Sequence, residues 1–125
     1  MAVLRAGDIE VRPLWSDSLG AKSSSVLVRT PDLSILIDPG AAAMQPSFPL
    51  PGEVKEELKQ RALRTIWRAS FKADAVVITH YHHDHYTRLG QGPGARSVYE
   101  GKLVWAKNPN SYINKSQWQR ARDVY

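Results

Sequence analysis

The sequence predicts a mixed α/β or α+β fold, on two observations. Short apolar runs alternate with turn residues over the first 40 positions, a pattern that indicates β-strands. Apolar residues then recur at helical spacing over residues 53–69, and another apolar run follows at 74–79. The length of 125 residues suits one small domain, so we expect residues 1–125 to form a single domain.

Three strands are expected in the first third of the chain. The run Ile9 to Trp15 is predicted to be an edge strand, because Pro13 cannot donate to a central ladder. The apolar runs Ser24 to Thr30 and Ser34 to Asp38 are separated by a short Pro-Asp turn, which predicts a β-hairpin. Residues 41–52 contain three prolines and are expected to be a surface loop.

Glu53 to Ala69 is the predicted helix. Glutamates near its start and arginines near its end match the helix dipole. Its apolar stripe comprises Val54, Leu58, Ala62, Leu63, Ile66, Trp67 and Ala69. The next run, Asp74 to Thr79, has an unbroken apolar core and is predicted to be a strand buried on both faces.

The last third is expected to contain a loop, a hairpin and a short helix. Gly90 to Gly94 is the predicted loop, and Val98 to Ala106 the predicted tight hairpin. Ser111 or Asn114 would cap the final helix. That helix would carry Ile113, Trp118 and Ala121.

The positive charge lies entirely in the last third. Residues 1–85 contain 10 basic and 10 acidic residues, which cancel, whereas residues 86–125 contain 7 basic and 2 acidic residues and account for the net charge of +5. Such a segment can bind nucleic acid or another anionic partner, and a solvated basic surface is the alternative. No signal peptide or membrane span is predicted, so we expect a cytoplasmic protein without a membrane partner.

All four histidines of the chain lie within six positions that follow the strand at 74–79. In an extended segment His80 and His82 point the same way and can hold one cation. If the chain then turns, Asp84 and His85 project together toward a second position. His83 falls outside this pattern, and surface histidines without a role are the alternative interpretation.

Imidazole and carboxylate ligands suit zinc, with iron or manganese as alternatives. The sequence contains no cysteine, which excludes thiolate sites. Two such ions about 3.5–4 Å apart can share a hydroxide nucleophile at neutral pH. We therefore predict two divalent metal ions on this segment, with Asp84 also as the candidate catalytic residue.

The pattern His80-x-His82-x-Asp84-His85 after an apolar strand resembles the signature of the metallo-β-lactamase-fold hydrolases. The upstream ILIDPG, residues 35–40, is similar to the strand of that fold that ends in Asp-x-Gly. Together with the segments SLGAKS, YEGK and NPNSYINKSQ, these motifs look closest to a mostly archaeal branch of the superfamily.

The resemblance implies the N-terminal half of an αββα sandwich with the metals at one edge of its two sheets. It assigns His80 and His82 to one ion, and Asp84 and His85 to the other. It also implies that Asp38 supports the metal-binding loop, whereas a plain turn aspartate is the alternative.

The family completes its site with two further histidines and a bridging aspartate from the C-terminal half, yet no histidine follows His85. We therefore expect a metal-dependent hydrolase, with two zinc ions, that needs a complementary C-terminal half or another copy of the chain. Its substrate would carry an ester, thioester, amide or phosphodiester bond, and residues 86–125 would favour nucleic acid. The alternative is a non-catalytic metal-binding module or assembly subunit.

Overall fold

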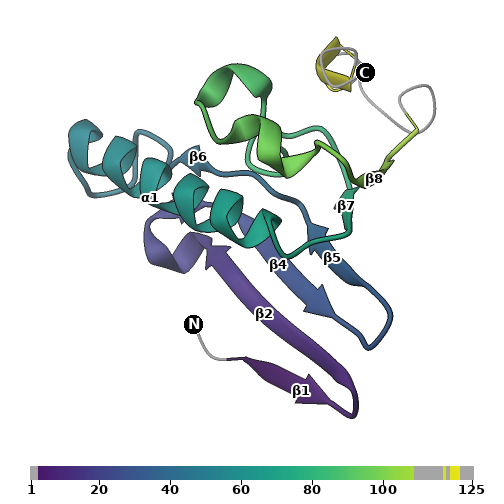
Figure 1. Cartoon of the computed structure of the whole chain (residues 1–125). Helices are drawn as coiled ribbons and strands as arrows, with labels where there is room; N and C mark the ends of the chain where they lie inside the picture. Colours follow the sequence, from purple (N-terminus) through teal and green to yellow (C-terminus); the bar gives the residue numbers. More distant parts are fainter. Residues whose placement is uncertain (1–2, 109–116, 118, 122–125) are drawn as a thin grey trace.

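The computed structural model describes residues 3–108, 117 and 119–121, and it confirms the mixed α/β class (Figure 1). In the described part of the chain, six strands form one sheet in the order β1-β2-β4-β5-β7-β8, and β3 and β6 form a separate pair. The elements are β1 (Leu4–Ala6), β2 (Ile9–Ser16), β3 (Ala21–Lys22), β4 (Ser24–Arg29), β5 (Ser34–Ile37), β6 (Ala42–Ala43), α1 (Gly52–Ser70), β7 (Ala75–Ile78) and β8 (Leu103–Ala106), with short 3-10 helices at Asp17–Leu19, Leu89–Gln91 and Ala95–Val98.

The topology changes direction between β5 and β7. Strands β1, β2, β4 and β5 run antiparallel in sequence order, whereas β5 and β7 pair in parallel, as do β7 and β8. Parallel neighbours need a crossover connection, and α1 supplies it between β5 and β7. The carboxyl ends of β5 and β7 therefore meet at one edge of the sheet, which brings the residues after Ile37 beside those after Ile78.

The predicted strands of the first third are present. The β4–β5 hairpin is confirmed, with Val28 opposite Ile35. Strand β2 is not the outermost strand, because β1 pairs with its residues 9–11. Pro13 nevertheless lies past the end of β1 and beside a shift in register, so its missing N–H breaks no bond to that strand. The predicted loop at 41–52 is mostly loop, but it also contains β6.

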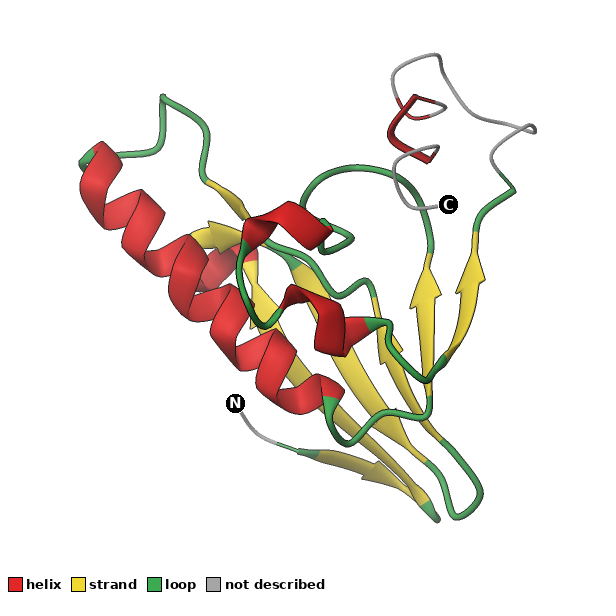
Figure 2. Ribbon diagram, turned by 45° about the horizontal axis from the view of Figure 1, so that its top comes forward, coloured by secondary structure: helices red, strands yellow, loops and turns green. Residues whose placement is uncertain are grey.

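Helix α1 is confirmed and covers one face of the sheet (Figure 2). The centre of its packed face comprises Ala62, Leu63, Ile66 and Trp67, whereas Val54, Leu58 and Ala69 at the margins of the predicted stripe are only half-buried. Leu27 of β4, Leu36 of β5 and Val76 of β7 are fully buried and belong to the same core cluster. The core thus lies between α1 and the sheet.

The predicted hairpin over Val98 to Ala106 is wrong. Val98 ends a 3-10 helix and is fully buried in the core rather than paired in a ladder. Only Leu103–Ala106 is a strand, and it pairs in parallel with β7. The local pattern over residues 98–106 predicts a hairpin, but Leu103–Ala106 pairs with the edge of β7 instead. Here a tertiary contact outweighs the local preference.

The predicted C-terminal helix falls largely outside the described residues. Its expected caps, Ser111 and Asn114, lie there, as do Ile113 and Trp118. Gln117 and residues 119–121 are described as helical, and Ala121 is fully buried in the core cluster.

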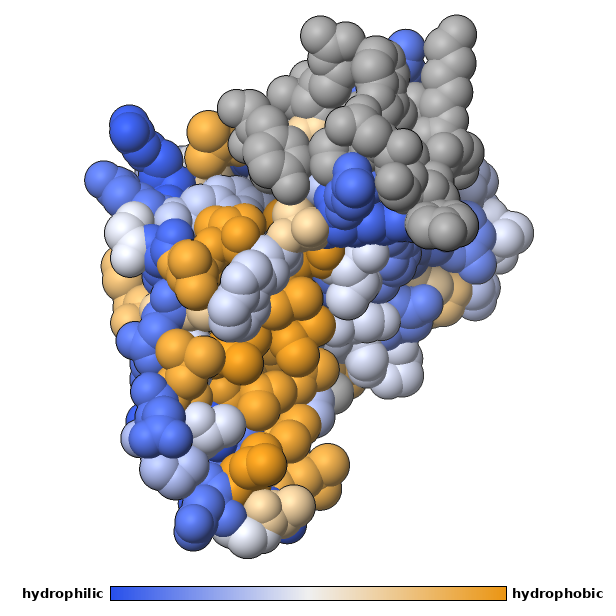
Figure 3. Space-filling view, turned by 90° about the vertical axis from the view of Figure 1, so that its right-hand side faces the viewer, coloured by the Kyte–Doolittle hydropathy of each residue, from blue (hydrophilic) through white to orange (hydrophobic). Residues whose placement is uncertain are grey.

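The sheet face opposite α1 is apolar and lies open to solvent. Side chains alternate along each strand and paired residues share a face, so the strand register identifies the members of this face. We call this surface the open face, formed by Leu4, Ile9, Val11, Val26, Val28, Ile35, Ile37, Val77, Leu103 and Trp105. Figure 3 shows a broad apolar surface on the side of the molecule at the right of Figure 1. Leu4, Leu103 and Trp105 at its two ends are about half exposed or more.

The described helices are too short or too polar to cross a membrane.

Candidate metal centre

The candidate site lies where β5 and β7 end side by side. Asp38 follows β5 and donates its backbone N–H to Val77 O at 2.8 Å. Its φ of 48° lies in the left-handed region, which aspartate tolerates better than most residues. This conformation turns the chain at the sheet edge, so the Asp38 side chain faces the first residues after β7.

The Asp38 carboxylate joins the two ends of residues 79–86, which we call the histidine-rich segment. Oδ1 accepts the backbone N–H of Thr79 at 2.8 Å, and Oδ2 accepts the Thr79 hydroxyl at 2.7 Å. Oδ2 also accepts Nδ1–H of His85 at 2.9 Å. Burial alone would raise the pKa of Asp38, but the hydrogen bonds from His85 and Thr79 outweigh burial and hold the pKa below its usual value. Asp38 is therefore a buried, ionised carboxylate.

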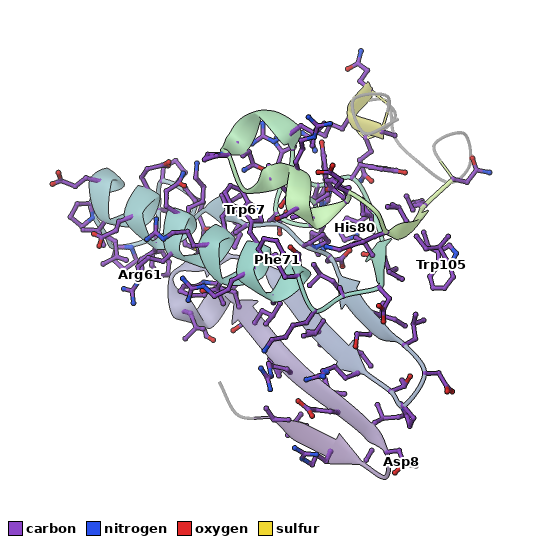
Figure 4. The ribbon with its side chains drawn as sticks, viewed as in Figure 1. Asp8, Arg61, Trp67, Phe71, His80 and Trp105 are labelled. Carbon is purple, nitrogen blue, oxygen red and sulfur yellow. The ribbon has the colours of Figure 1, made fainter. Side chains whose placement is uncertain are left out.

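Three of the four imidazoles lie together above this carboxylate. The ring centroids of His80 and His85 are 3.9 Å apart, and those of His80 and His82 are 4.7 Å apart. His80 lies beyond the end of β7 (Figure 4). His83, which the sequence pattern leaves out, lies against the ring of Tyr86 with centroids 6.0 Å apart.

Thr79 selects the tautomer of His80. The Thr79 hydroxyl has one proton and donates it to Asp38, so the 3.0 Å contact between Thr79 Oγ1 and His80 Nδ1 is a bond donated by the imidazole. Burial and the neighbouring positive charge of His85 lower the pKa of His80, which favours its neutral form. A neutral His80 protonated at Nδ1 carries its lone pair on Nε2, the arrangement of a metal-ligating histidine.

His85 lies between two carboxylates. Its Nδ1 faces Asp38 and its Nε2 is 3.3 Å from Asp84 Oδ2. Hydrogen bonds to Asp38 and Asp84 raise the pKa of His85 to about 9. The bond from His85 also lowers the pKa of Asp84. The proton on His85 thus supplies the positive charge that two neighbouring carboxylates require.

The donor set fits a divalent cation in kind, since imidazole nitrogens and carboxylate oxygens are what zinc, iron and manganese bind. Among residues 3–108, 117 and 119–121, however, no three such side chains converge on one point as a ready site. Their donor atoms instead contact neighbours: His82 Nε2 is 3.1 Å from Gln117 Nε2, and both nitrogens of His85 face carboxylates. Metal binding would require these side chains to exchange partners.

Several contacts of this site could not be found from the sequence pattern. Gln117 accepts the backbone N–H of Tyr81 at 3.2 Å, and Arg120 donates to the Tyr81 carbonyl at 3.3 Å. Both lie more than 30 positions from the loop, so no local spacing indicates them. Thr79 is the one such contact with a local sequence signal, because it is a polar residue directly after an apolar strand and directly before His80.

The histidine-rich segment packs directly on the turn after Asp38. A Cβ atom at Gly40 would lie 2.4 Å from the Tyr86 nitrogen and 2.8 Å from its carbonyl oxygen. The next residue, Thr87, donates its hydroxyl to Pro39 O at 2.5 Å and accepts the indole N–H of Trp67 at 3.0 Å. These contacts connect the segment to both β5 and α1.

The chain is similar in sequence to one protein family and to several curated relatives. A family model described as metallo-beta-lactamase superfamily matches residues 20–100. A UPF0282 protein of Korarchaeum cryptofilum is 42% identical over 114 residues, covering 90% of this chain and 37% of its own length. A UPF0282 protein of Methanopyrus kandleri is 37% identical over 122 residues, covering 91% of this chain and 42% of its own length. The chain thus spans about two fifths of these curated relatives, and no solved structure matches it.

We predict that Gly40→Ala destabilises the chain, because the new methyl group would overlap the Tyr86 backbone. Backbone cannot yield as a flexible side chain can, so we expect a loss of about 1–3 kcal/mol in the free energy of unfolding. Denaturant unfolding of both variants measures it, with Gly90→Ala as the control because a Cβ there meets no atom within 4 Å. Equal stability of the two variants would contradict the close approach.

Proposed function

The chain belongs to the metallo-beta-lactamase superfamily, and on this premise we propose that it is the metal-binding part of a metal-dependent hydrolase. Members of this superfamily typically bind divalent metals. The observation that carries the proposal is the gathering of three imidazoles and two carboxylates where β5 and β7 end.

We assign His80 and His82 to one metal ion, and Asp84 and His85 to a second. Zinc is the first candidate, with iron or manganese as alternatives. A divalent ion at such a site supplies a Lewis acid and water activation at neutral pH. Asp38 would hold the rings of His80 and His85 in orientation through Thr79 and through Nδ1 of His85. Asp84 is the proposed catalytic carboxylate, because it lies among the histidines, with its Oδ2 3.3 Å from His85 Nε2, and a carboxylate can orient a water.

The substrate class rests on charge alone. An ester or phosphodiester, including that of a nucleic acid, would suit the basic residues of 86–125. Two of these residues, Lys102 and Arg120, donate to backbone carbonyls of the chain itself, and Arg96 lies 3.9 Å from Glu100. These contacts direct three of the basic side chains toward the chain itself.

The exposed apolar surface of the open face is evidence that a partner binds there. The described ligand set lacks the later histidines and aspartate that the family resemblance implies, and the open face is an apolar surface of six strands. Covering several hundred Å² of such a surface contributes many kcal/mol at about 25 cal/mol per Å². We propose that a complementary half of the sandwich, or a second copy of the chain, covers the open face and completes the ligand set.

A non-catalytic metal-binding module is the second candidate. One observation favours it, since no histidine follows His85 in the sequence to complete a two-metal site. The two candidates differ in whether hydrolysis appears once the partner is bound.

We predict that metal binds through the assigned histidines. Protein purified without a histidine tag should carry zinc, iron or manganese by elemental analysis, and the His80→Ala/His82→Ala variant should lose it because one cation loses both ligands. His83→Ala is the matched control and should retain metal. Equal metal content in all three proteins would exclude the assignment.

We predict that Asp38→Asn lowers metal affinity about 10- to 100-fold, the usual effect of removing a carboxylate that orients ligating histidines. Asparagine tolerates the left-handed backbone at this position, so the change acts on the hydrogen bonds rather than on the turn. Competition with a chelating dye measures the affinity. Asp32→Asn removes the same charge from an exposed turn and should have no effect; if both variants match the unchanged protein, Asp38 is only a turn residue.

We predict that the chain works as an assembly. Native mass spectrometry should find it bound to another copy or to a complementary chain, and Val28→Lys on the open face should weaken that association by placing a charge in an apolar contact. Ser47→Lys adds the same charge to an exposed loop and should leave the assembly intact. A metal-loaded monomer that hydrolyses a generic phosphodiester or ester would contradict the prediction.

A further inference from the structure

A cleft of about 340 Å³ lies between the second half of α1 and strand β2. Its walls carry Arg68 and Lys72 from the helix side and Arg12 from β2, and its apolar lining includes Leu14, Leu27 and Ala69. None of its lining residues belongs to the candidate metal centre. The cleft is on the α1 side of the sheet, so a partner on the open face would leave it accessible.

The charged side chains that line this cleft are all positive. Its lining contains three cationic side chains and no carboxylate. Glu10 lies outside the lining and accepts one bond from Arg12, Nη2 to Oε1 at 3.1 Å, while the same carboxylate lies 3.6 Å from Arg5. One carboxylate therefore serves two guanidinium groups.

Arg12 also carries an unpaired donor. Its Nε is buried and has no hydrogen-bond partner in the described part of the chain. This atom is enclosed by the protein and does not face the cleft. The Arg12 side chain as a whole is about a third exposed, 34%, and a guanidinium has five N–H donors in a planar fork, so an anion in the cleft can reach the terminal nitrogens on a side that Glu10 does not occupy.

The lining of the cleft is apolar where it meets the core. Leu27 is fully buried and Leu14 is 7% exposed, so the bottom of the cleft offers hydrocarbon rather than polar atoms. Thr65 adds little polarity, because its hydroxyl donates to Arg61 O at 2.9 Å. A ligand suited to this cleft has an anionic head for the rim and an apolar or flat body for the bottom.

We propose that the cleft between α1 and β2 binds a small phosphate monoester with an apolar or aromatic body, of the kind represented by a nucleoside monophosphate. A phosphate monoester carries nearly two negative charges at neutral pH and accepts several charge-assisted bonds, which matches three cations better than a single carboxylate would. A volume near 340 Å³ lies at the small end of ligand pockets and suits a molecule of this size. The binding does not depend on the proposed hydrolase.

The alternative is that Arg68 and Lys72 only complement the negative end of the α1 dipole and bind no ligand. Arg61 and Arg64 lie on the same exposed side of α1 as Arg68 but do not line the cleft. Removing them subtracts the same total charge as removing Arg68 and Lys72. They therefore provide a matched control for diffuse electrostatic attraction.

The test is calorimetric titration of the 125-residue chain with adenosine monophosphate, adenosine and inorganic phosphate, in a chelator so that no metal contributes. We expect saturable binding of adenosine monophosphate and much weaker binding of adenosine. The Arg68→Gln/Lys72→Gln variant should bind at least about tenfold more weakly, because it loses two charge-assisted contacts. The Arg61→Gln/Arg64→Gln variant should bind within about twofold of the unchanged chain.

Three results would overturn the proposal. Absence of measurable binding at millimolar adenosine monophosphate would exclude the site. Equal weakening by the two double variants would show diffuse attraction to a basic helix. Inorganic phosphate that binds as tightly as the nucleotide would remove the role given to the apolar lining. All four substituted positions are exposed on the surface of α1 or just beyond it, so loss of folding does not confound the comparison.

Discussion

The buried carboxylate of Asp38 is the constraint on which the candidate site depends. It accepts bonds from the Thr79 backbone, the Thr79 hydroxyl and His85, so one side chain joins the end of β5 to both ends of the histidine-rich segment. The Thr79 hydroxyl then determines which nitrogen of His80 carries the proton. Because the parallel pairing of β5 and β7 brings these ends together, the arrangement follows from the crossover through α1.

Close packing fixes the same segment from its other side. Gly40 lets the backbone of Tyr86 approach the turn after β5, and Thr87 connects Pro39 to Trp67 of α1. The positions of the histidines are therefore set by glycine, threonine and tryptophan residues that donate nothing to a metal. These contacts hold the backbone of the segment in place without using its donor side chains.

The sequence predicted the parts of the molecule that depend on local pattern. The β4–β5 hairpin, α1 and β7 were identified because their apolar residues repeat at the period of one element. The hairpin over 98–106 failed because the free edge of β7 paired with Leu103–Ala106, a contact that no spacing within the run reveals. At the site, the histidines and Asp84 are visible in the sequence because they lie within six positions, but the bonds of Gln117 and Arg120 to Tyr81 join residues more than 30 positions apart.

The proposed partner would explain two features of the described chain together. The open face is apolar, whereas the solvent-facing side of a sheet usually carries polar residues. At the sheet edge, the donors of His82 and His85 contact Gln117, Asp38 and Asp84 rather than a common point. A second layer that packs on the open face would reach the same edge, where β5 and β7 end. One partner can therefore cover the apolar surface and bring ligands to which these side chains can turn, so stability and metal binding would depend on the same association.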